Sequence, residues 1–193
     1  VFGGSQAWDS ESKYNDAWAL DVTTGAWTMV LPHDSTCVKE GTTGCPVRRA
    51  QHSSVVIGGL VVVFGGNDYV GSSYVPLNDV WSLDVMQKQW TRLHAYDAAC
   101  DGTTCPRTRR AHVAAAIGGK MVVFGGYQNG AGRLDDTWSF DVYRRDWTKV
   151  HDGGGGGASA CPSARYYQSS VAAGSEMIVT GGWDSSSRRN DVW

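Results

Sequence analysis

The residues with the clearest capacity for chemistry are five cysteines, which all lie in three similar segments. The segments read CVKEGTTGCP (37–46), CDGTTCP (100–106) and GGGGGASACP (153–162). The last cysteine of each segment precedes a proline, and the three align as Cys45, Cys105 and Cys161. Cys37 and Cys100 also align with each other, whereas the third segment has Gly157 at that place. Two segments therefore carry a cysteine pair and one carries a single cysteine.

Three kinds of cysteine chemistry fit this pattern. The first is a local disulfide in each paired segment, Cys37–Cys45 and Cys100–Cys105, with Cys161 outside them, and such bonds form in oxidising compartments. The second is free thiols in a cytoplasmic protein. The third is zinc, because a histidine–cysteine–cysteine–histidine set occurs twice, as His33, Cys37, Cys45, His52 and as His94, Cys100, Cys105, His112.

The spacing and the repeat favour the disulfides over the metal. Cysteine spacings of eight and five residues are irregular for a structural zinc site. His52 and His112 also recur at the beginning of a predicted strand, where a structural role accounts for them. We predict the two disulfides, no metal and no cofactor. The compartment stays open, since oxidised pairs would indicate the extracellular space or the secretory-pathway lumen, and reduced thiols the cytoplasm.

An internal repeat must position these segments. VVVFGG (61–66) nearly recurs as MVVFGG (121–126), VFGG begins the chain, and IVTGG occupies 178–182. A short element with aspartate and tryptophan follows each glycine pair, as NDAW, NDVW, DDTW and NDVW. A lone tryptophan then follows three of these elements, as Trp27, Trp90 and Trp147. Markers that recur in one order indicate a repeated structural unit of about 60 residues.

Each unit is predicted to form a four-stranded antiparallel meander. First strands are expected at 52–57, 112–117 and 168–173, each followed by a tight turn with glycine. The second strand is apolar on both faces, hence buried, and ends on the glycine pair. The third strand carries the tryptophan of the DVW element, and the fourth begins at the lone tryptophan. An aspartate that can accept backbone N–H bonds begins the turn between them, as Asp21, Asp84 and Asp141.

This pattern resembles the kelch repeat, through the glycine pair, the NDVW element, the fourth-strand tryptophan and an arginine before the first strand (Arg49, Arg109 and Arg165). The resemblance covers the whole chain and implies an all-β fold, a β-propeller of four-stranded antiparallel blades. The units comprise a half blade (1–31), two full blades (49–93 and 109–150) and a partial blade (165–193). Because a kelch propeller closes with more blades than this, we expect a partial propeller that is part of a longer one.

The segments that break the repeat are those that follow each glycine pair. In a propeller these segments and the cysteine segments open on the same face. Tyrosine, tryptophan and arginine are enriched in binding hot spots, and this face would carry Trp8, Tyr69, Tyr74, Tyr127, Arg133, Trp183 and Arg188. We predict a protein-interaction or scaffold module that binds protein partners through these residues. The competing interpretation of each ring is packing onto the blade edge.

No catalytic residue is predicted, because the aspartates that follow the repeat are expected to serve turns and strand contacts. The alternative function is a secreted propeller that binds glycan or forms part of a galactose-oxidase-like enzyme, since the resemblance extends to that group. A net charge of −2, from 17 basic and 19 acidic residues, does not favour nucleic acid as a partner. No apolar run long enough to insert into a membrane occurs in this segment.

Overall fold

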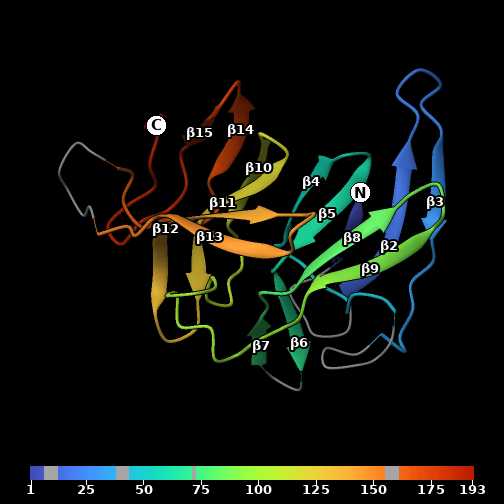
Figure 1. Ribbon diagram of the computed structural model, residues 1–193, viewed down its shortest axis with the longest axis horizontal. Helices are drawn as coiled ribbons and strands as arrows, with labels where there is room; N and C mark the ends of the chain where they lie inside the picture. Colours follow the sequence, from blue (N-terminus) through green and yellow to red (C-terminus); the bar gives the residue numbers. More distant parts are fainter. Residues whose placement is uncertain (7–12, 38–43, 71–72, 155–160) are drawn as a thin grey trace.

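A computed structural model describes residues 1–6, 13–37, 44–70, 73–154 and 161–193, and in these residues the regular structure is entirely β (Figure 1). No helix in this part of the chain is long and apolar enough to cross a membrane. The strands of the described residues are, in chain order, β1 (Phe2–Ser5), β2 (Lys13–Leu20), β3 (Trp27–Leu31), β4 (Ser53–Ile57), β5 (Leu60–Phe64), β6 (Asn67–Val70), β7 (Ser73–Pro76), β8 (Val80–Asp84), β9 (Gln89–His94), β10 (Val113–Ile117), β11 (Lys120–Gln128), β12 (Gly132–Asp141), β13 (Asp146–His151), β14 (Ser169–Ala173) and β15 (Glu176–Thr180).

The strands form antiparallel sheets of the kind expected for kelch blades. Two sheets are complete four-stranded meanders, with the orders β4-β5-β8-β9 and β10-β11-β12-β13. Before them lies the three-stranded sheet β1-β2-β3, and after them the pair β14-β15. Every named strand pair is antiparallel. The kelch-type partial propeller predicted from the sequence is confirmed, as are its strand positions to within a residue or two in most cases.

The glycine pairs let neighbouring blades approach closely. Gly65 has φ +59°, and a Cβ there would lie 3.0 Å from the carbonyl oxygen of Arg109 and 3.1 Å from that of Leu77. The next glycine, Gly66, donates its N–H to the same Arg109 oxygen at 3.0 Å. A side chain at Gly65 would therefore meet the backbone of the next blade, which explains why each apolar strand stops on glycine.

The segments after two glycine pairs are more regular than expected from the sequence. Residues 67–77 contain the hairpin β6–β7, in which Tyr69 faces Tyr74. In the next blade, β11 continues through the glycine pair to Gln128, with a register shift between Phe124 and Gly126. The bulge at the glycines accounts for this continuation, because it changes the direction of the strand without ending its pairing. Figure 1 places these arms at the lower end of the molecule, opposite the β4–β5 and β14–β15 turns.

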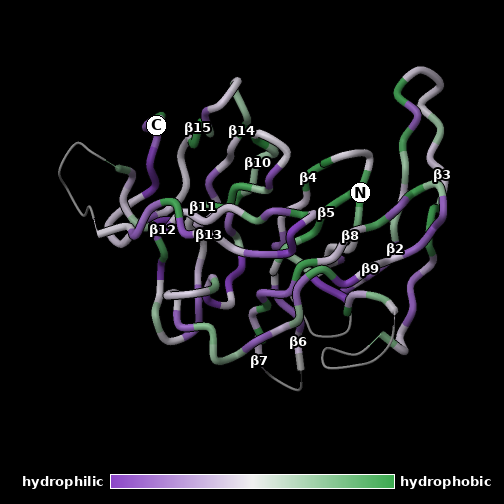
Figure 2. Tube along the Cα trace, viewed as in Figure 1, coloured by the Kyte–Doolittle hydropathy of each residue, from purple (hydrophilic) through white to green (hydrophobic). Residues whose placement is uncertain are grey.

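Aromatic and aliphatic side chains fill the space between blades. Phe2 of one blade packs edge-on against Trp90 of the next, with ring centroids 4.8 Å apart, and Phe64 packs in the same way against Trp147 at 4.9 Å. Figure 2 shows hydrophobic residues along β4, β5 and β10, and of these Ile57, Val62 and Phe64 are buried in one cluster. Trp90 and Trp147, which begin the fourth-strand element in the repeat, thus pack between blades. Trp27 differs, since it is 52% exposed and no described blade covers it.

An arginine–aspartate ion pair also joins strands within each of the last three blade units. Both terminal nitrogens of Arg49 donate to the carboxylate of Asp79, each at 2.8 Å, and Trp81 Nε1 donates to the same carboxylate at 2.8 Å. The pairs Arg109–Asp136 and Arg165–Asp191 repeat this geometry. The aspartates that recur with the repeat therefore make contacts between strands, as predicted. Their carboxylates are already bonded to arginine and tryptophan side chains of the fold.

Candidate functional site

The predicted binding residues lie in a chain of cations and aromatic rings that crosses from blade to blade. Lys13 Nζ lies 5.4 Å from the ring centre of Tyr69 and 5.0 Å from that of Tyr74. On the other side of Tyr74, the Arg110 guanidinium is 4.9 Å from its ring and 5.1 Å from the ring of Tyr127. Such distances fit cation–π attraction. The arms β6–β7 and β11–β12 therefore meet through Arg110.

The chain continues into the last blade. The rings of Tyr127 and Tyr166 are 5.6 Å apart, and Tyr166 stacks on Trp183 at 5.8 Å. Arg133 lies over Tyr166 at 5.5 Å, and Arg188 over Trp183 at 6.0 Å. We call this surface the cation–aromatic face, made of Lys13, Tyr69, Tyr74, Arg110, Tyr127, Arg133, Tyr166, Trp183 and Arg188.

The structure brings together all the described members of the predicted set. Tyr69, Tyr74, Tyr127 and Arg133 are all half-buried, so each side chain both packs on the fold and keeps some exposed surface. Trp8 lies outside the described residues. The sequence interpretation missed three members, namely Lys13, Arg110 and Tyr166. Arg110 and Tyr166 both follow the buried arginine of their repeats, whereas Ala50 follows Arg49 in the repeat before them. This variation at one repeat position was the signal available in the sequence.

A pocket of about 360 Å³ lies on the cation–aromatic face, lined by residues that include Arg110, Arg133, Tyr127 and Tyr166. The Nε atoms of both arginines are buried and have no hydrogen-bond partner among the described residues. Arg110 reaches Gln51 Oε1 through Nη1 at 3.5 Å, a contact at the long limit. Two guanidinium groups thus line one opening, and no described carboxylate pairs with either of them.

A second pocket, of about 320 Å³, adjoins the first through Gln51 and is lined by Lys13, Asn67 and Tyr74 among others. Lys13 is only 4% exposed, and burial lowers the pKa of its amine to about 8, against the opposing effect of Asp68. With its amide oriented to satisfy both ends, Asn67 accepts from Lys13 Nζ at 2.8 Å. The amine is therefore held in place within the wall of the pocket.

Backbone hydrogen bonds join the neighbouring blades at the residues that line the two pockets. The N–H of Ala111 donates to the carbonyl of Gln51 at 2.8 Å, and the N–H of Tyr167 donates to that of Ala111 at 3.0 Å. All three residues have positive φ. The Gln51 side-chain amide also donates to the Tyr167 hydroxyl, which joins the second blade to the fourth. A ligand on this face would meet a preorganised surface, which lowers the entropy lost on binding.

The cysteine segments are closed by the two predicted disulfides. Cys37 is bonded to Cys45 and Cys100 to Cys105, with Cα separations of 5.6 and 5.5 Å, while Cys161 is a free thiol. The histidine–cysteine–cysteine–histidine zinc set is not assembled. The ring of His52 packs against Phe2 at 5.3 Å and that of His112 against Phe64 at 5.0 Å, both in the interblade core.

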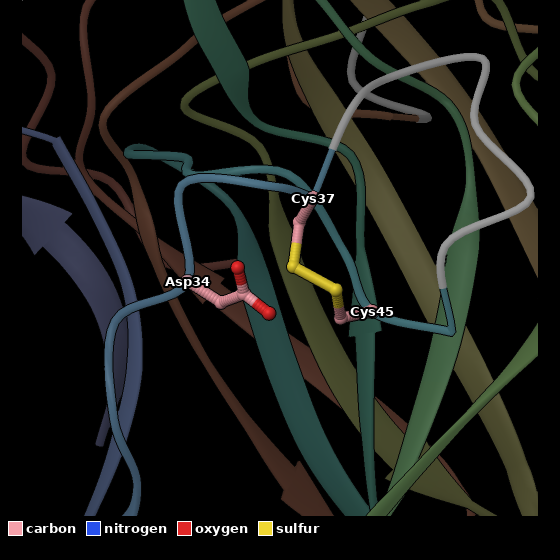
Figure 3. Close-up of side chains that lie close together, drawn as sticks. All are labelled: Asp34, Cys37 and Cys45. Carbon is pink, nitrogen blue, oxygen red and sulfur yellow. A yellow bond between two sulfur atoms is a disulfide. The ribbon is translucent and has the colours of Figure 1, made fainter.

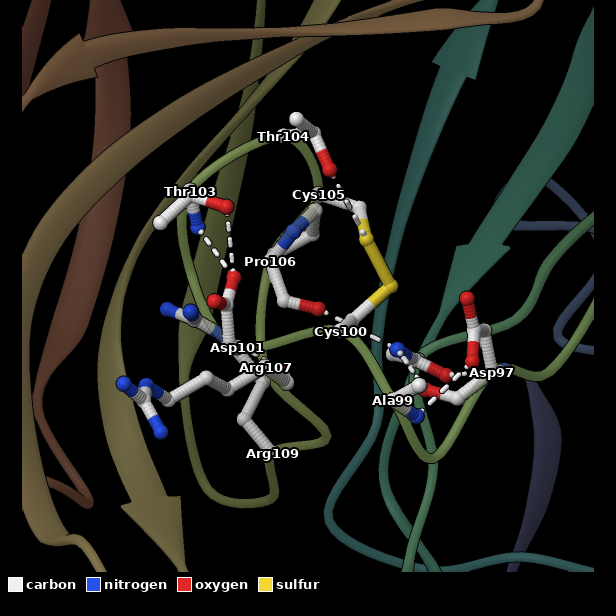
Figure 4. Close-up of a disulfide and its surroundings, with 11 residues drawn as sticks. Asp97, Ala99, Cys100, Asp101, Thr103, Thr104, Cys105, Pro106, Arg107 and Arg109 are labelled. Atoms are coloured by element: carbon white, nitrogen blue, oxygen red, sulfur yellow. Dashed lines mark hydrogen bonds between the residues drawn. A yellow bond between two sulfur atoms is a disulfide. The ribbon is translucent and has the colours of Figure 1, made fainter.

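A buried asparagine closes each paired segment independently of its disulfide. Asn78 donates from Nδ2 to the carbonyls of Asp97 at 2.8 Å and Pro106 at 3.1 Å, and its Oδ1 accepts the Asp97 N–H at 3.0 Å. Figure 4 shows Asp97 and Pro106 on either side of the Cys100–Cys105 bond. The segment is thus held at its two ends by one side chain.

This arrangement predicts that Asn78 contributes more to the free energy of unfolding than the Cys100–Cys105 disulfide does. For a loop this short, the chain-entropy model gives at most about 2.5 kcal/mol for the bond. Asn78→Ala would leave two carbonyls and one N–H unpaired, at about 1–3 kcal/mol for each that is buried. Urea unfolding should therefore show a larger loss for Asn78→Ala than for the Cys100→Ser, Cys105→Ser double variant. The opposite order would contradict the prediction.

Comparison with known proteins gives one family. The profile of the KLHDC2/KLHL20/DRC7 Kelch-repeats domain matches residues 1–103 and 95–193. The chain is 28% identical to Kelch domain-containing protein 3 of Homo sapiens over 152 residues, which is 78% of this chain and 37% of that protein.

For two further relatives, the matched region covers a smaller share of the relative's own length. The Host cell factor homolog hcf-1 of Caenorhabditis elegans is 29% identical over 157 residues, 76% of this chain and 18% of that protein. The tRNA wybutosine-synthesizing protein 2/3/4 of Arabidopsis thaliana is 28% identical over 129 residues, 67% of this chain and 11% of that protein. The chain therefore spans well under half the length of the curated relatives it matches.

Proposed function

The chain belongs to the kelch-repeat family, whose members are generally protein-interaction modules, and from this premise we propose that it binds an acidic segment of a protein partner on the cation–aromatic face. The module has no catalytic role in this proposal. That it forms part of a longer propeller or a larger assembly remains a prediction.

The pocket between Arg110 and Arg133 carries the proposal. A guanidinium makes charge-assisted, often bidentate hydrogen bonds to a carboxylate, and these are stronger than neutral ones. Neither guanidinium is paired with a described carboxylate, so each keeps a positive charge to which a carboxylate of a ligand could bind. The tyrosine rings around them add apolar area at low conformational cost. Acidic side chains flanked by apolar or aromatic ones are therefore the best match for this surface.

The neighbouring pocket supports a peptide of more than one residue. It shares Gln51 with the arginine pocket, and amide and hydroxyl groups of Ser5, Gln6 and Asn67 line it. These groups can hydrogen-bond a peptide backbone or a polar side chain. An extended segment could place a carboxylate between the arginines and a polar residue beside Lys13.

A displayed library of random peptides tests this proposal. Selection on the chain should enrich aspartate and glutamate, and the selected peptides should bind more weakly as salt is raised. The double variant Arg110→Gln, Arg133→Gln should weaken their binding at least about tenfold, because two charge-assisted contacts are lost.

The matched control is Arg144→Gln. Arg144 lies in the turn between β12 and β13, and its side chain is 77% exposed beside Asp146. This variant should keep the affinity of the chain for the selected peptides. Enrichment without acidic residues, or equal affinity for the double variant with an unchanged melting midpoint, would overturn the proposal. Selective binding of glycans on an array would instead favour the glycan-binding alternative.

A further inference from the structure

Each disulfide-bonded segment places a carboxylate beside its two sulfurs. In the first segment the possible ligand atoms of Asp34, Cys37 and Cys45 all lie within 4.8 Å of one another, and in the second those of Asp97, Cys100 and Cys105 do the same. Figure 3 shows the Asp34 carboxylate directed toward the Cys37–Cys45 bond. The aspartate stands three residues before the first cysteine in both segments. The same three groups are thus assembled twice.

The segments do not need the disulfide to keep these groups together. In the first, Asn15 donates from Nδ2 to the carbonyls of Asp34 at 2.9 Å and Pro46 at 3.1 Å, and Asn15 Oδ1 accepts the Asp34 N–H at 2.9 Å. Asn78 makes the same three bonds in the second. Pro46 adjoins Cys45 in sequence, so the asparagine ties the aspartate to the second cysteine. Reduction would therefore leave the carboxylate near the second thiol, and the first thiol stands three residues after the aspartate in the chain.

The carboxylate is also oriented by its local turn. Asp34 accepts the N–H of Thr36 at 2.8 Å and its hydroxyl at 2.6 Å, both through Oδ1. Asp97 accepts the N–H of Ala99 at 2.8 Å, also through Oδ1. The turn uses one oxygen in each case, and the second is the atom that a cation could take.

We propose that reduction of the disulfides converts each paired segment into a site for one thiophilic divalent cation, with Zn²⁺ as the best fit. Two thiolates and one carboxylate supply three tetrahedral ligands, and water takes the fourth position. Typical bonds to zinc of about 2.3 Å from sulfur and about 2.0–2.2 Å from oxygen require only small movements of groups already this close. The sites are independent of the proposed interaction with acidic peptides.

The chemistry balances in two steps. A thiol reductant, RSH, supplies two electrons, so that Cys–S–S–Cys and 2 RSH give two Cys–SH and RS–SR, through a mixed disulfide. The two thiols then bind Zn²⁺ and release two protons, since the thiolate is the ligand. In the reverse direction the disulfide RS–SR takes the two electrons and leaves as two RSH, so that the cysteine disulfide forms again and the cation is released. Each paired segment would therefore bind the cation only in its reduced state.

The third cysteine segment serves as an internal control. It has Gly154 at the aspartate position and Gly157 at the position of the first cysteine, with Cys161 alone. The proposal therefore requires two cations for each reduced chain and not three. It also requires that Cys161 contributes nothing to binding at equilibrium.

The test uses the full chain with Cys161→Ser, reduced by a phosphine, desalted without oxygen and titrated with ZnCl₂. We expect two bound Zn²⁺ for each reduced chain and none for the oxidised chain. Co²⁺ in place of Zn²⁺ should give the thiolate charge-transfer and tetrahedral d–d absorption bands. Asp97→Asn keeps an oxygen for the turn but removes the charge, and should weaken the second site roughly tenfold or more.

Asp101→Asn is the matched control. Asp101 lies between the two cysteines of the second segment and accepts the N–H of Thr103 at 2.9 Å and its hydroxyl at 2.6 Å, in a turn like that of Asp34. Figure 4 shows it on the other side of Cys100 from Asp97. This variant should bind Zn²⁺ like the parent chain. Fewer than two Zn²⁺ on a reduced chain that keeps its tryptophan fluorescence, or equal weakening by both asparagine variants, would overturn the proposal.

Discussion

Replacement of Asp136 by asparagine is expected to lower the free energy of unfolding by about 3–5 kcal/mol, because it leaves a buried guanidinium without its counter-charge. The Arg109 side chain has no exposed surface, and it donates to Asp136 at 2.7 and 2.8 Å. Arg109 Nη1 also donates to the carbonyl of Gly125 at 3.1 Å, next to the glycine pair. Loss of the carboxylate would therefore disturb the contact between two strands and the close approach of the next blade.

The repeat supplies a graded control for this prediction. Arg165 and Asp191 form the same pair, but the Asp191 side chain is 35% exposed, whereas that of Asp136 is 11% exposed. Water can replace a carboxylate that is partly exposed, although the Arg165 side chain itself is only 1% exposed, so Asp191→Asn should cost less than Asp136→Asn. Urea unfolding at pH 7 should give midpoints that fall in this order with unchanged slopes. Equal losses at the two positions would show that burial of the pair is not the cause.

The acid dependence of the pair has a definite sign. Contacts with Arg109 and Trp138 outweigh burial and lower the pKa of Asp136 below its ordinary value of 3.8. A carboxylate with a lowered pKa stabilises the fold above the pKa of the unfolded chain, and this contribution is lost as the pH falls through the folded value. The Asp136 contribution should therefore be complete at pH 5 and be lost only below pH 3.8.

The blades could be predicted from the sequence because their signals are local and repeated. In a strand such as 61–66, the two final glycines predict both where the strand ends and where its backbone approaches a neighbouring segment closely. The aspartate turn is equally local, since Asp84 Oδ1 accepts the N–H groups of Met86 and Gln87, both at 2.9 Å. Each such element carries a local sequence signal, even where, as at Gly65, its close contact is with the next blade, and the repeat shows the same signal several times.

The cation–aromatic face could be predicted only in part, because its contacts join residues that differ between repeats. Arg110 bridges Tyr74 and Tyr127, which belong to arms of two different blades. No single repeat contains that arrangement. The asparagine that closes each cysteine segment was also missed, because Asn78 is part of the NDVW element and was interpreted with the strand. Asn78 and the Pro106 carbonyl to which it donates are 28 residues apart in sequence.

The interblade histidines should make the chain lose stability in mild acid. His112 is 5% exposed, and its Nδ1 is buried without a hydrogen-bond partner in the described residues. Burial, and then the neighbouring Arg109, lower the pKa of His112 well below 6.5, and the same causes with Arg49 lower that of the half-buried His52 to about 3. Both imidazoles are therefore neutral in the folded chain at pH values where they take up a proton once unfolded.

The sign and size of the effect follow from proton linkage. Between pH 6.5 and about 3 the unfolded chain binds more protons than the folded chain, so stability falls as the pH falls. The slope approaches 1.4 kcal/mol for each pH unit and each fully shifted histidine, which is about 2 kcal/mol for His112 between pH 6.5 and 4.5. This window lies above the range in which Asp136 is protonated, so the two effects separate.

The third repeat provides the variant that tests this prediction. Gln168 occupies the place of His112 in the next blade, is 6% exposed and donates from Nε2 to the carbonyl of Phe124 at 3.1 Å. His112→Gln should therefore fold, and its urea midpoint should change less between pH 6.5 and 4.5 than that of the parent chain. His151→Gln, an exposed position in β13, should keep the parent slope. An unchanged pH dependence in His112→Gln would contradict the prediction, because the proton uptake would then belong to other groups.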